Sequence, residues 1–141
     1  NTQLVFFDTP GYISSAGALR KEAATLRETA TESADKADVI LLVVDAARVL
    51  NDNAKFLFGE MVSIALRKAR KEIILVLNKV DLVEPKVKLL DLTRELVSLI
   101  NGVKLGVEKA HLAELDTTTF MISALNNDGV LDIKNYLIRI A

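Results

Sequence analysis

The sequence contains no cysteine, and this absence excludes both a disulfide framework and a thiolate metal site. It also lacks a long apolar run: the longest, 39–44 and 73–77, are far shorter than the ~20 residues that a membrane-spanning helix needs. The net charge of −1 gives no reason to expect bulk electrostatic binding of nucleic acid. With no signal or transit peptide apparent, the 141 residues predict one ordinary globular domain, compatible with an intracellular compartment.

The clearest polar motif is Asn78-Lys79-Val80-Asp81, which directly follows the aliphatic run from Ile73 to Leu77. Such a run, bounded by charge, indicates a buried parallel strand. The motif then lies at the carboxyl end of that strand, where open α/β sheets bind their ligands. The Asp81 carboxylate can accept two parallel hydrogen bonds from guanine N1–H and N2–H₂, a pair that adenine does not offer. The Asn78 amide both donates and accepts, and the Lys79 stem can lie along the base plane.

A second polar turn, Asp8-Thr9-Pro10-Gly11, follows the β-prone run from Gln3 to Phe7, which predicts a further strand. An Asp at a strand end can hold a magnesium ion through a water, and the N–H of a following Gly can approach a terminal phosphate. Taken alone, these four residues are an ordinary turn. Beside the Asn-Lys-x-Asp motif, the magnesium-nucleotide interpretation is favoured.

Residue spacing predicts two helices and one strand between these motifs. Residues 13–36 carry an apolar stripe that is half alanine, so we expect a loosely docked helix, either a segment that moves with the nucleotide or an ordinary surface helix. Residues 39–44 predict an aliphatic strand, and we interpret Asp45 after it as a polar strand end or loop cap. Residues 54–69 form the clearest amphipathic pattern. The basic residues 67–71 are expected to complement that helix C-terminus, with RNA contact as the alternative.

Beyond the tetrad, Pro85 predicts the start of a helix, and Asn101-Gly102 predicts its end. Residues 107–115 allow a short helix. It would present His111, the only histidine, on an exposed face, and a catalytic or ligand role is the alternative.

The last predicted strand, residues 118–122, ends in Ser123-Ala124-Leu125, and a closing helix carries the apolar stripe from Val130 to Ile140. The small Ser-Ala pair lets backbone N–H groups approach a base carbonyl. Strands that alternate with helices predict an α/β fold, with a parallel sheet covered on both faces. Three polar loops at strand carboxyl ends then define one crevice.

These motifs, in this order, resemble the P-loop GTPases and, within them, the Era-like branch. The resemblance covers the whole chain and is carried by residues 6–11 (FFDTPG), 38–46 (DVILLVVDA), 77–82 (LNKVDL) and Ser123-Ala124. It implies a three-layer fold with a mostly parallel sheet flanked by helices. It also implies GTP or GDP as the nucleotide and Mg²⁺ as the metal.

The same resemblance assigns the nucleotide to residues of three loops: Asp8, Thr9, Pro10, Gly11, Asn78, Lys79, Asp81, Ser123, Ala124 and Leu125. Asp8, which holds Mg²⁺ through a water, and Gly11, at the terminal phosphate, are the implied catalytic residues. Asn78 and Asp81 would read the guanine, and Lys79 would cover its face. The Ala124 amide would meet the guanine carbonyl oxygen.

Two departures from the family pattern matter. Tyr12 stands where many GTPases carry a water-positioning Gln, so hydrolysis does not rely on that side chain. The chain also contains no G-x-x-x-x-G-K-[ST], the loop that cradles phosphates. We therefore expect residues 1–141 to be the C-terminal part of an Era-type G domain, without the upstream P-loop and the downstream KH domain. Because the P-loop strand would separate the strands 3–7 and 39–44, they should lie two strand spacings apart, ~9–10 Å, and not pair directly.

The predicted function is that of a GTP-binding and GTP-hydrolysing switch. It would assist small ribosomal subunit assembly by binding rRNA through parts outside this chain, with the parent protein, rather than the fragment, as the GTPase. Two alternatives stay open: a non-hydrolysing scaffold with the GTPase fold, or a related Era-like GTPase that acts on tRNA. The segment from Lys86 to Leu105 resembles mitochondrial Era-like proteins, so we expect an organelle matrix, with a bacterial cytoplasm as the alternative.

Overall fold

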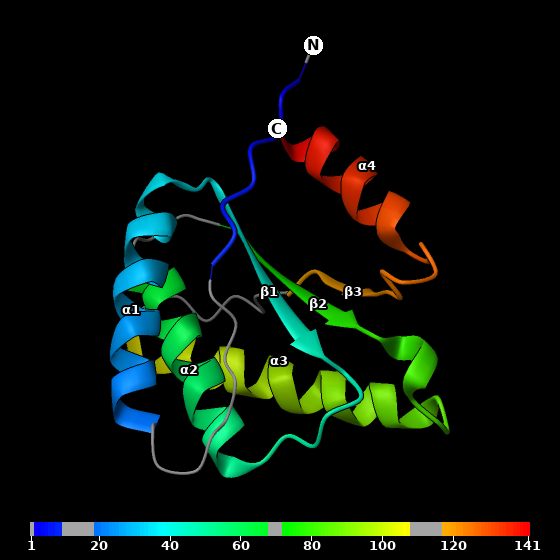
Figure 1. Ribbon diagram of the computed structural model, residues 1–141, viewed down its shortest axis with the longest axis horizontal. Helices are drawn as coiled ribbons and strands as arrows, with labels where there is room; N and C mark the ends of the chain where they lie inside the picture. Colours follow the sequence, from blue (N-terminus) through cyan, green and yellow to red (C-terminus); the bar gives the residue numbers. More distant parts are fainter. Residues whose placement is uncertain (1, 10–18, 68–71, 108–116) are drawn as a thin grey trace.

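The computed structural model describes residues 2–9, 19–67, 72–107 and 117–141 of the chain (Figure 1). Helices and strands alternate along it, as the sequence predicts. Their bounds are α1 (Leu19–Lys36), β1 (Val39–Asp45), α2 (Asp52–Arg67), β2 (Glu72–Asn78), the 3₁₀ turn η1 (Val80–Leu82), α3 (Val87–Val107), β3 (Thr119–Met121) and α4 (Val130–Ile140). No helix in these ranges is long and apolar enough to cross a bilayer.

The sheet has three parallel strands in the order β1-β2-β3. The ladder between β1 and β2 runs from the pair Val39 and Glu72 to the pair Asp45 and Asn78. The central strand is buried from Ile73 to Leu77, as expected for an aliphatic run with neighbours on both edges and helices on both faces. The predicted α/β class with a parallel sheet is confirmed.

Side chains of β2 alternate between two hydrophobic clusters. Leu75 and Leu77 pack with Leu96 of α3 and with part of α2, whereas Ile74 and Val76 pack with Leu137 of α4. Helices α2 and α3 therefore cover one face of the sheet and α4 covers the other (Figure 1). Burying one such aliphatic side chain contributes about 1.5–3 kcal/mol. The three layers thus depend mainly on this one strand.

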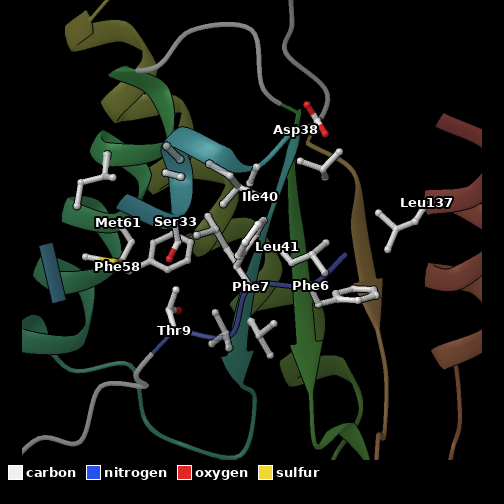
Figure 2. A pocket seen from close by; sticks show the side chains of 18 of the residues that line it. Phe6, Phe7, Thr9, Ser33, Asp38, Ile40, Leu41, Phe58, Met61 and Leu137 are labelled. Atoms are coloured by element: carbon white, nitrogen blue, oxygen red, sulfur yellow. The ribbon is translucent and has the colours of Figure 1, made fainter. Parts of the chain in front are cut away.

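The predicted strand from Gln3 to Phe7 is not found. Residues 2–9 belong to no ladder in the described part of the chain, and Val5 and Phe6 remain 65% and 69% exposed. A cavity of about 1350 Å³ is lined by this segment, by β1 and by helix side chains that include Ser33, Phe58 and Met61 (Figure 2). A strand needs a partner for its backbone hydrogen bonds, and no strand lies beside this segment among the described residues. Direct pairing of residues 3–7 with β1, which would contradict a separating strand, is likewise absent from the described ladders.

Helix α3 also differs from its prediction. It begins at Val87, two residues after Pro85, and continues through Gly102 to Val107 instead of ending at Asn101-Gly102. The buried Ile100 continues the core stripe at this point, and an interior Gly costs only about 1 kcal/mol relative to Ala. Tertiary packing therefore outweighs the local stop signal. The predicted helix at 107–115 with His111, the first residues of the helix at 13–36, and the basic residues 68–71 lie outside the described residues.

Two glycines make a matched test of this fold. Gly129 has φ +71°, and a Cβ there would lie 2.8 Å from the Met121 carbonyl oxygen. A left-handed L-residue costs ~1–2 kcal/mol, so with this clash Gly129→Ala should lower the free energy of unfolding by about 2 kcal/mol or more. Gly102 lies in α3, and a Cβ added there would meet no atom within 4 Å. Gly102→Ala should therefore raise the free energy of unfolding by ~0.5–1 kcal/mol. Urea unfolding measures both, and equal stability of the two variants would contradict this loop geometry.

Candidate functional site

The carboxyl ends of β1 and β2 bring two polar side chains to one edge of the sheet. Asp45 and Asn78 are ladder partners, and the Ala46 N–H donates to the Asn78 carbonyl at 2.9 Å. Both residues end strands of seven residues, so their positions are set by the same register. Asn78 belongs to one of the three loops of the predicted crevice, and Asp45, which is not predicted to be part of it, lies beside Asn78.

Asn78 joins two loops that are far apart in sequence. Its Oδ1 accepts hydrogen bonds from the Lys79 N–H at 2.8 Å and from the Ala124 N–H at 3.0 Å. A further hydrogen bond runs from the Val80 N–H to the Ile122 carbonyl oxygen at 3.2 Å. The Asn-Lys-x-Asp loop and the Ser-Ala loop therefore adjoin, as their motifs predict. The Asn78 Nδ2 group has no protein partner among the described residues, so it can donate to a ligand.

Asp81 lies in η1, a single turn held by the residues around it. Lys86 Nζ donates to the Val80 and Val83 carbonyls, at 2.8 Å and 2.9 Å, and thereby closes the turn. The Asp81 carboxylate itself has no hydrogen bond or ion pair within the described part of the chain. It is therefore a charged acceptor, held on a fixed turn, that is available to a ligand.

Lys79 has a left-handed backbone, with φ 65° and ψ 34°. Its side chain reaches β1, where Nζ lies 2.7 Å from Asp45 Oδ2. Asp45 also accepts the Ala47 N–H at 3.1 Å and has the Arg48 Nε at 3.5 Å. The ammonium group of the residue predicted to cover a base is thus held by the strand next to its own.

The pKa of Asp45 reflects these neighbours. Partial burial alone would raise it. The hydrogen bond from Lys79, the Ala47 N–H and the charges of Lys79 and Arg48 outweigh that effect, and the pKa lies below its ordinary value. The carboxylate is therefore charged at neutral pH.

The Ser123-Ala124-Leu125 loop is built on a short antiparallel bridge. The Ser123 and Asp128 backbones exchange hydrogen bonds of 3.1 and 3.0 Å, and Ser123 Oγ accepts the Asn126 N–H at 3.3 Å. Ser123 is 2% exposed, so its side chain stabilises the loop and does not face solvent. The Ala124 N–H, assigned by resemblance to a base carbonyl, donates here to Asn78. The next N–H, that of the 88% exposed Leu125, has no partner in the described ranges.

The first predicted loop is only partly described. Asp8 is exposed. Thr9 lines the cavity beside β1 near the carboxyl end of that strand, and Asp38 lies near its amino end (Figure 2). Pro10 and Gly11 lie outside the described residues. Within the described ranges no three His, Cys, Asp or Glu side chains gather as metal ligands. The metal role of Asp8 and the catalytic role of Asp8 and Gly11 stay predictions.

Two residues of this site, Asp45 and Lys86, are not predicted from the sequence to belong to it. The pattern indicates only a strand end or loop cap for Asp45, and it places Lys86 only in a helical segment. The position of Asp45 beside Asn78 can be found from the sequence if the aliphatic runs 39–44 and 73–77 are aligned at their ends, because each run is followed directly by a polar residue. The contact of Lys86 with η1 has no comparable signal, since it depends on the path of the turn.

The lowered pKa of Asp45 predicts a pH-dependent contribution to stability. A depressed carboxyl pKa stabilises the fold above the unfolded-state value of ~3.9, and this contribution is lost as the pH falls through the lower folded-state value. Asp45→Asn should cost about 0.5–1 kcal/mol at pH 7, the range of a partly exposed ion pair. The difference from the parent chain should shrink progressively as the pH falls below the unfolded-state value. Thermal unfolding across this pH range measures it, and a difference that does not shrink with falling pH would contradict the ion pair.

Comparison with known proteins follows the same motifs. The family model described as "Elongation factor Tu GTP binding domain" matches residues 1–141. GTPase Era of Brucella melitensis biotype 1 is 38% identical over 135 residues, which is 96% of this chain and 36% of that protein. GTPase Era of Bradyrhizobium sp. (strain BTAi1) is 38% identical over 136 residues, 96% of this chain and 37% of that protein. The chain thus spans little more than a third of the length of these relatives.

One solved structure shares the fold with a TM-score of 0.62 and 22% identity, over 94% of this chain and 38% of the other. It is a crystal structure of Era in complex with MgGDPNP and nucleotides 1506–1542 of 16S ribosomal RNA. A whole-chain family match, relatives of this identity and a shared fold agree with the motif order. The chain therefore belongs to the family of elongation factor Tu GTP-binding domains and is an Era-like member of the P-loop GTPases.

Proposed function

We propose that this chain forms the guanine-recognising part of a GTP-binding and GTP-hydrolysing switch. The observation that carries the proposal is the hydrogen bond from the Ala124 N–H to Asn78 Oδ1. It joins the two loops whose polar groups would surround a base. The Asp81 carboxylate and the Asn78 Nδ2 group, which have no protein partner among the described residues, and the Lys79 stem would match the edge and face of guanine.

The donor and acceptor pattern of the slot supports guanine over adenine. The Asp81 carboxylate would accept from N1–H and N2–H₂, whereas adenine presents an acceptor at N1. The Asn78 Nδ2 group would donate to an acceptor on the base. The exposed Leu125 N–H, or the Ala124 N–H shared with Asn78, would meet the base carbonyl. Charged hydrogen bonds of this kind contribute roughly 1.5–3 kcal/mol each, which is enough for selectivity.

The phosphate end of the ligand needs more than the described residues offer. When bound, Mg²⁺ supplies positive charge that neutralises the phosphates. Asp8 would hold it through a water, and the Gly11 N–H would approach the terminal phosphate. Among the described residues, Asp8 is a single carboxylate without further ligands, which is not a complete metal site. We therefore propose that residues outside this chain supply the remaining phosphate and metal contacts in the natural protein.

The cavity beside β1 supports this division of the site. The outer edge of β1 has no strand partner in the described part of the chain, and Val43 is 63% exposed despite its place in an aliphatic run. Such a run is typical of an inner strand. We propose that a strand from outside residues 1–141 occupies the cavity between residues 2–9 and β1 and carries the phosphate-binding loop.

Hydrogen exchange tests this strand in the natural protein that contains the chain. In a parallel sheet, alternate N–H groups of β1 point toward β2, and the others point into the cavity. With a strand in the cavity, both sets should exchange slowly. The N–H groups of β2, paired on both sides, are the control. Rapid exchange of every second N–H in β1 would contradict an added strand.

The partner of the switch is proposed from relatives. The related solved structure contains 16S ribosomal RNA, and the relatives above are named GTPase Era. This supports a role in small ribosomal subunit assembly through rRNA, bound by parts outside this chain. The compartment stays a prediction from the segment Lys86 to Leu105, either an organelle matrix such as that of mitochondria or a bacterial cytoplasm.

A second candidate is a scaffold that keeps the fold without hydrolysing GTP. The phosphate-binding motif G-x-x-x-x-G-K-[ST] discriminates between the two candidates: its presence in the natural protein favours the switch, and its absence there favours the scaffold. Phosphate release from GTP by the natural protein separates the two candidates. Turnover that depends on Mg²⁺ supports the switch, and binding without turnover supports the scaffold.

Base selectivity tests the central assignment. Asp81→Asn replaces an acceptor with a donor, so affinity for GTP should fall by about 10–100-fold, while xanthosine triphosphate should become the preferred ligand. Competition binding to the natural protein measures the ratio. Asp132→Asn, which removes an exposed carboxylate from α4, is the matched control and should leave the ratio unchanged. A variant that still prefers GTP would refute the role of Asp81.

A further inference from the structure

Asp45 is the anchor of the contact with Lys79, not the mobile partner. Its Oδ1 accepts the Ala47 N–H, so the carboxylate is oriented by its own loop, and its side chain is 25% exposed. Lys79 is 50% exposed and contacts Asp45 only through its terminal ammonium at 2.7 Å. The four-carbon stem between backbone and ammonium is therefore held at both ends.

The course of that stem follows from the backbone. Lys79 directly follows Asn78 in a left-handed conformation, and its ammonium reaches Asp45 at the end of β1. Asn78 is at the same time bonded to Ala124. The stem therefore starts beside the groups that surround the proposed base and ends at the tip of the neighbouring strand.

We propose that Asp45 is a positioning residue for nucleotide binding, which holds the Lys79 stem in place before the base arrives. The inference rests on the proposed function. A free lysine side chain samples many rotamers and loses this freedom when a base packs on it. With the ammonium already held by Asp45, that loss occurs on folding and does not weaken binding. Asp45 itself touches no part of the ligand.

This role makes a different prediction from base reading. The stem packs on the face of a purine and does not contact the exocyclic groups that distinguish one purine from another. Loss of Asp45 should therefore weaken the binding of GDP and of inosine diphosphate by the same factor. Loss of the Asp81 carboxylate should instead change the ratio between bases. The two residues are thus distinguishable by measurement even though they lie in one site.

A double-mutant cycle in the natural protein tests the proposal. Asp45→Asn keeps an oxygen for the Ala47 N–H but removes the charge that binds the ammonium, so the variant should fold. It should weaken the binding of GDP about 3–10-fold, as measured by calorimetry. The ratio of the dissociation constants for GDP and inosine diphosphate should stay unchanged. In a Lys79→Met background, the same substitution should weaken GDP binding by less than about twofold, because the ammonium group through which Asp45 acts is gone.

The control is Glu95→Gln, which removes one negative charge from the ion pair with Lys55, at 2.5 Å, between α2 and α3. Its GDP affinity should equal that of the parent protein. Equal affinity of Asp45→Asn and the parent, or an equal loss with and without Lys79, would overturn the positioning role. Failure of the parent protein to bind GDP would instead refute the proposed function. If the parent protein binds GDP and Asp81→Asn changes the preferred base, the proposed function holds. The result for Asp45→Asn then decides this inference by itself.

Discussion

Burial of β2 on both faces is the constraint on which the rest of the structure depends. Ile74, Leu75 and Leu77 are fully enclosed, and each face of the strand contacts a different set of helices. Because side chains alternate, a shift of register by one residue would exchange these two sets and expose both clusters. The register is therefore fixed, and with it the level at which all three strands end. The polar loops gain their common position from hydrophobic packing and not from their own interactions.

On this frame, one side-chain amide couples the two loops of the site. Asn78 Oδ1 binds a backbone N–H of its own loop and one of the Ser-Ala loop, so neither loop can move without affecting the other. The arrangement leaves the Asp81 carboxylate and the Asn78 Nδ2 group for a ligand. It also places Lys79 in a left-handed conformation, which costs ~1–3 kcal/mol and is typical of residues whose position serves binding.

The unpaired edge of β1 explains the cavity of about 1350 Å³ beside it. Its aliphatic sequence suits an inner strand, yet only its β2 side is paired in the described ladders. The facing segment, residues 2–9, carries the apolar run from Leu4 to Phe7 and belongs to no ladder in the described part of the chain, and both it and β1 line the cavity. An unpaired aliphatic edge is a site for association with another strand. The same edge ends in Asp45, so any strand added there would lie next to the ion pair with Lys79.

The α/β order, the parallel sheet and the adjacency of the Asn-Lys-x-Asp and Ser-Ala loops follow from the sequence, since aliphatic runs must be buried and the ends of parallel strands meet at one edge. Asn78 and Asp81 are identifiable as candidates in the same way, because their chemistry is local. The folded contacts were needed to show that Gln3 to Phe7 is not a strand, that α3 passes through Gly102, that Asp45 holds Lys79 and that the Ala124 N–H binds Asn78. Each of these depends on a partner distant in sequence, and a propensity or a motif carries no information about which partner is within reach.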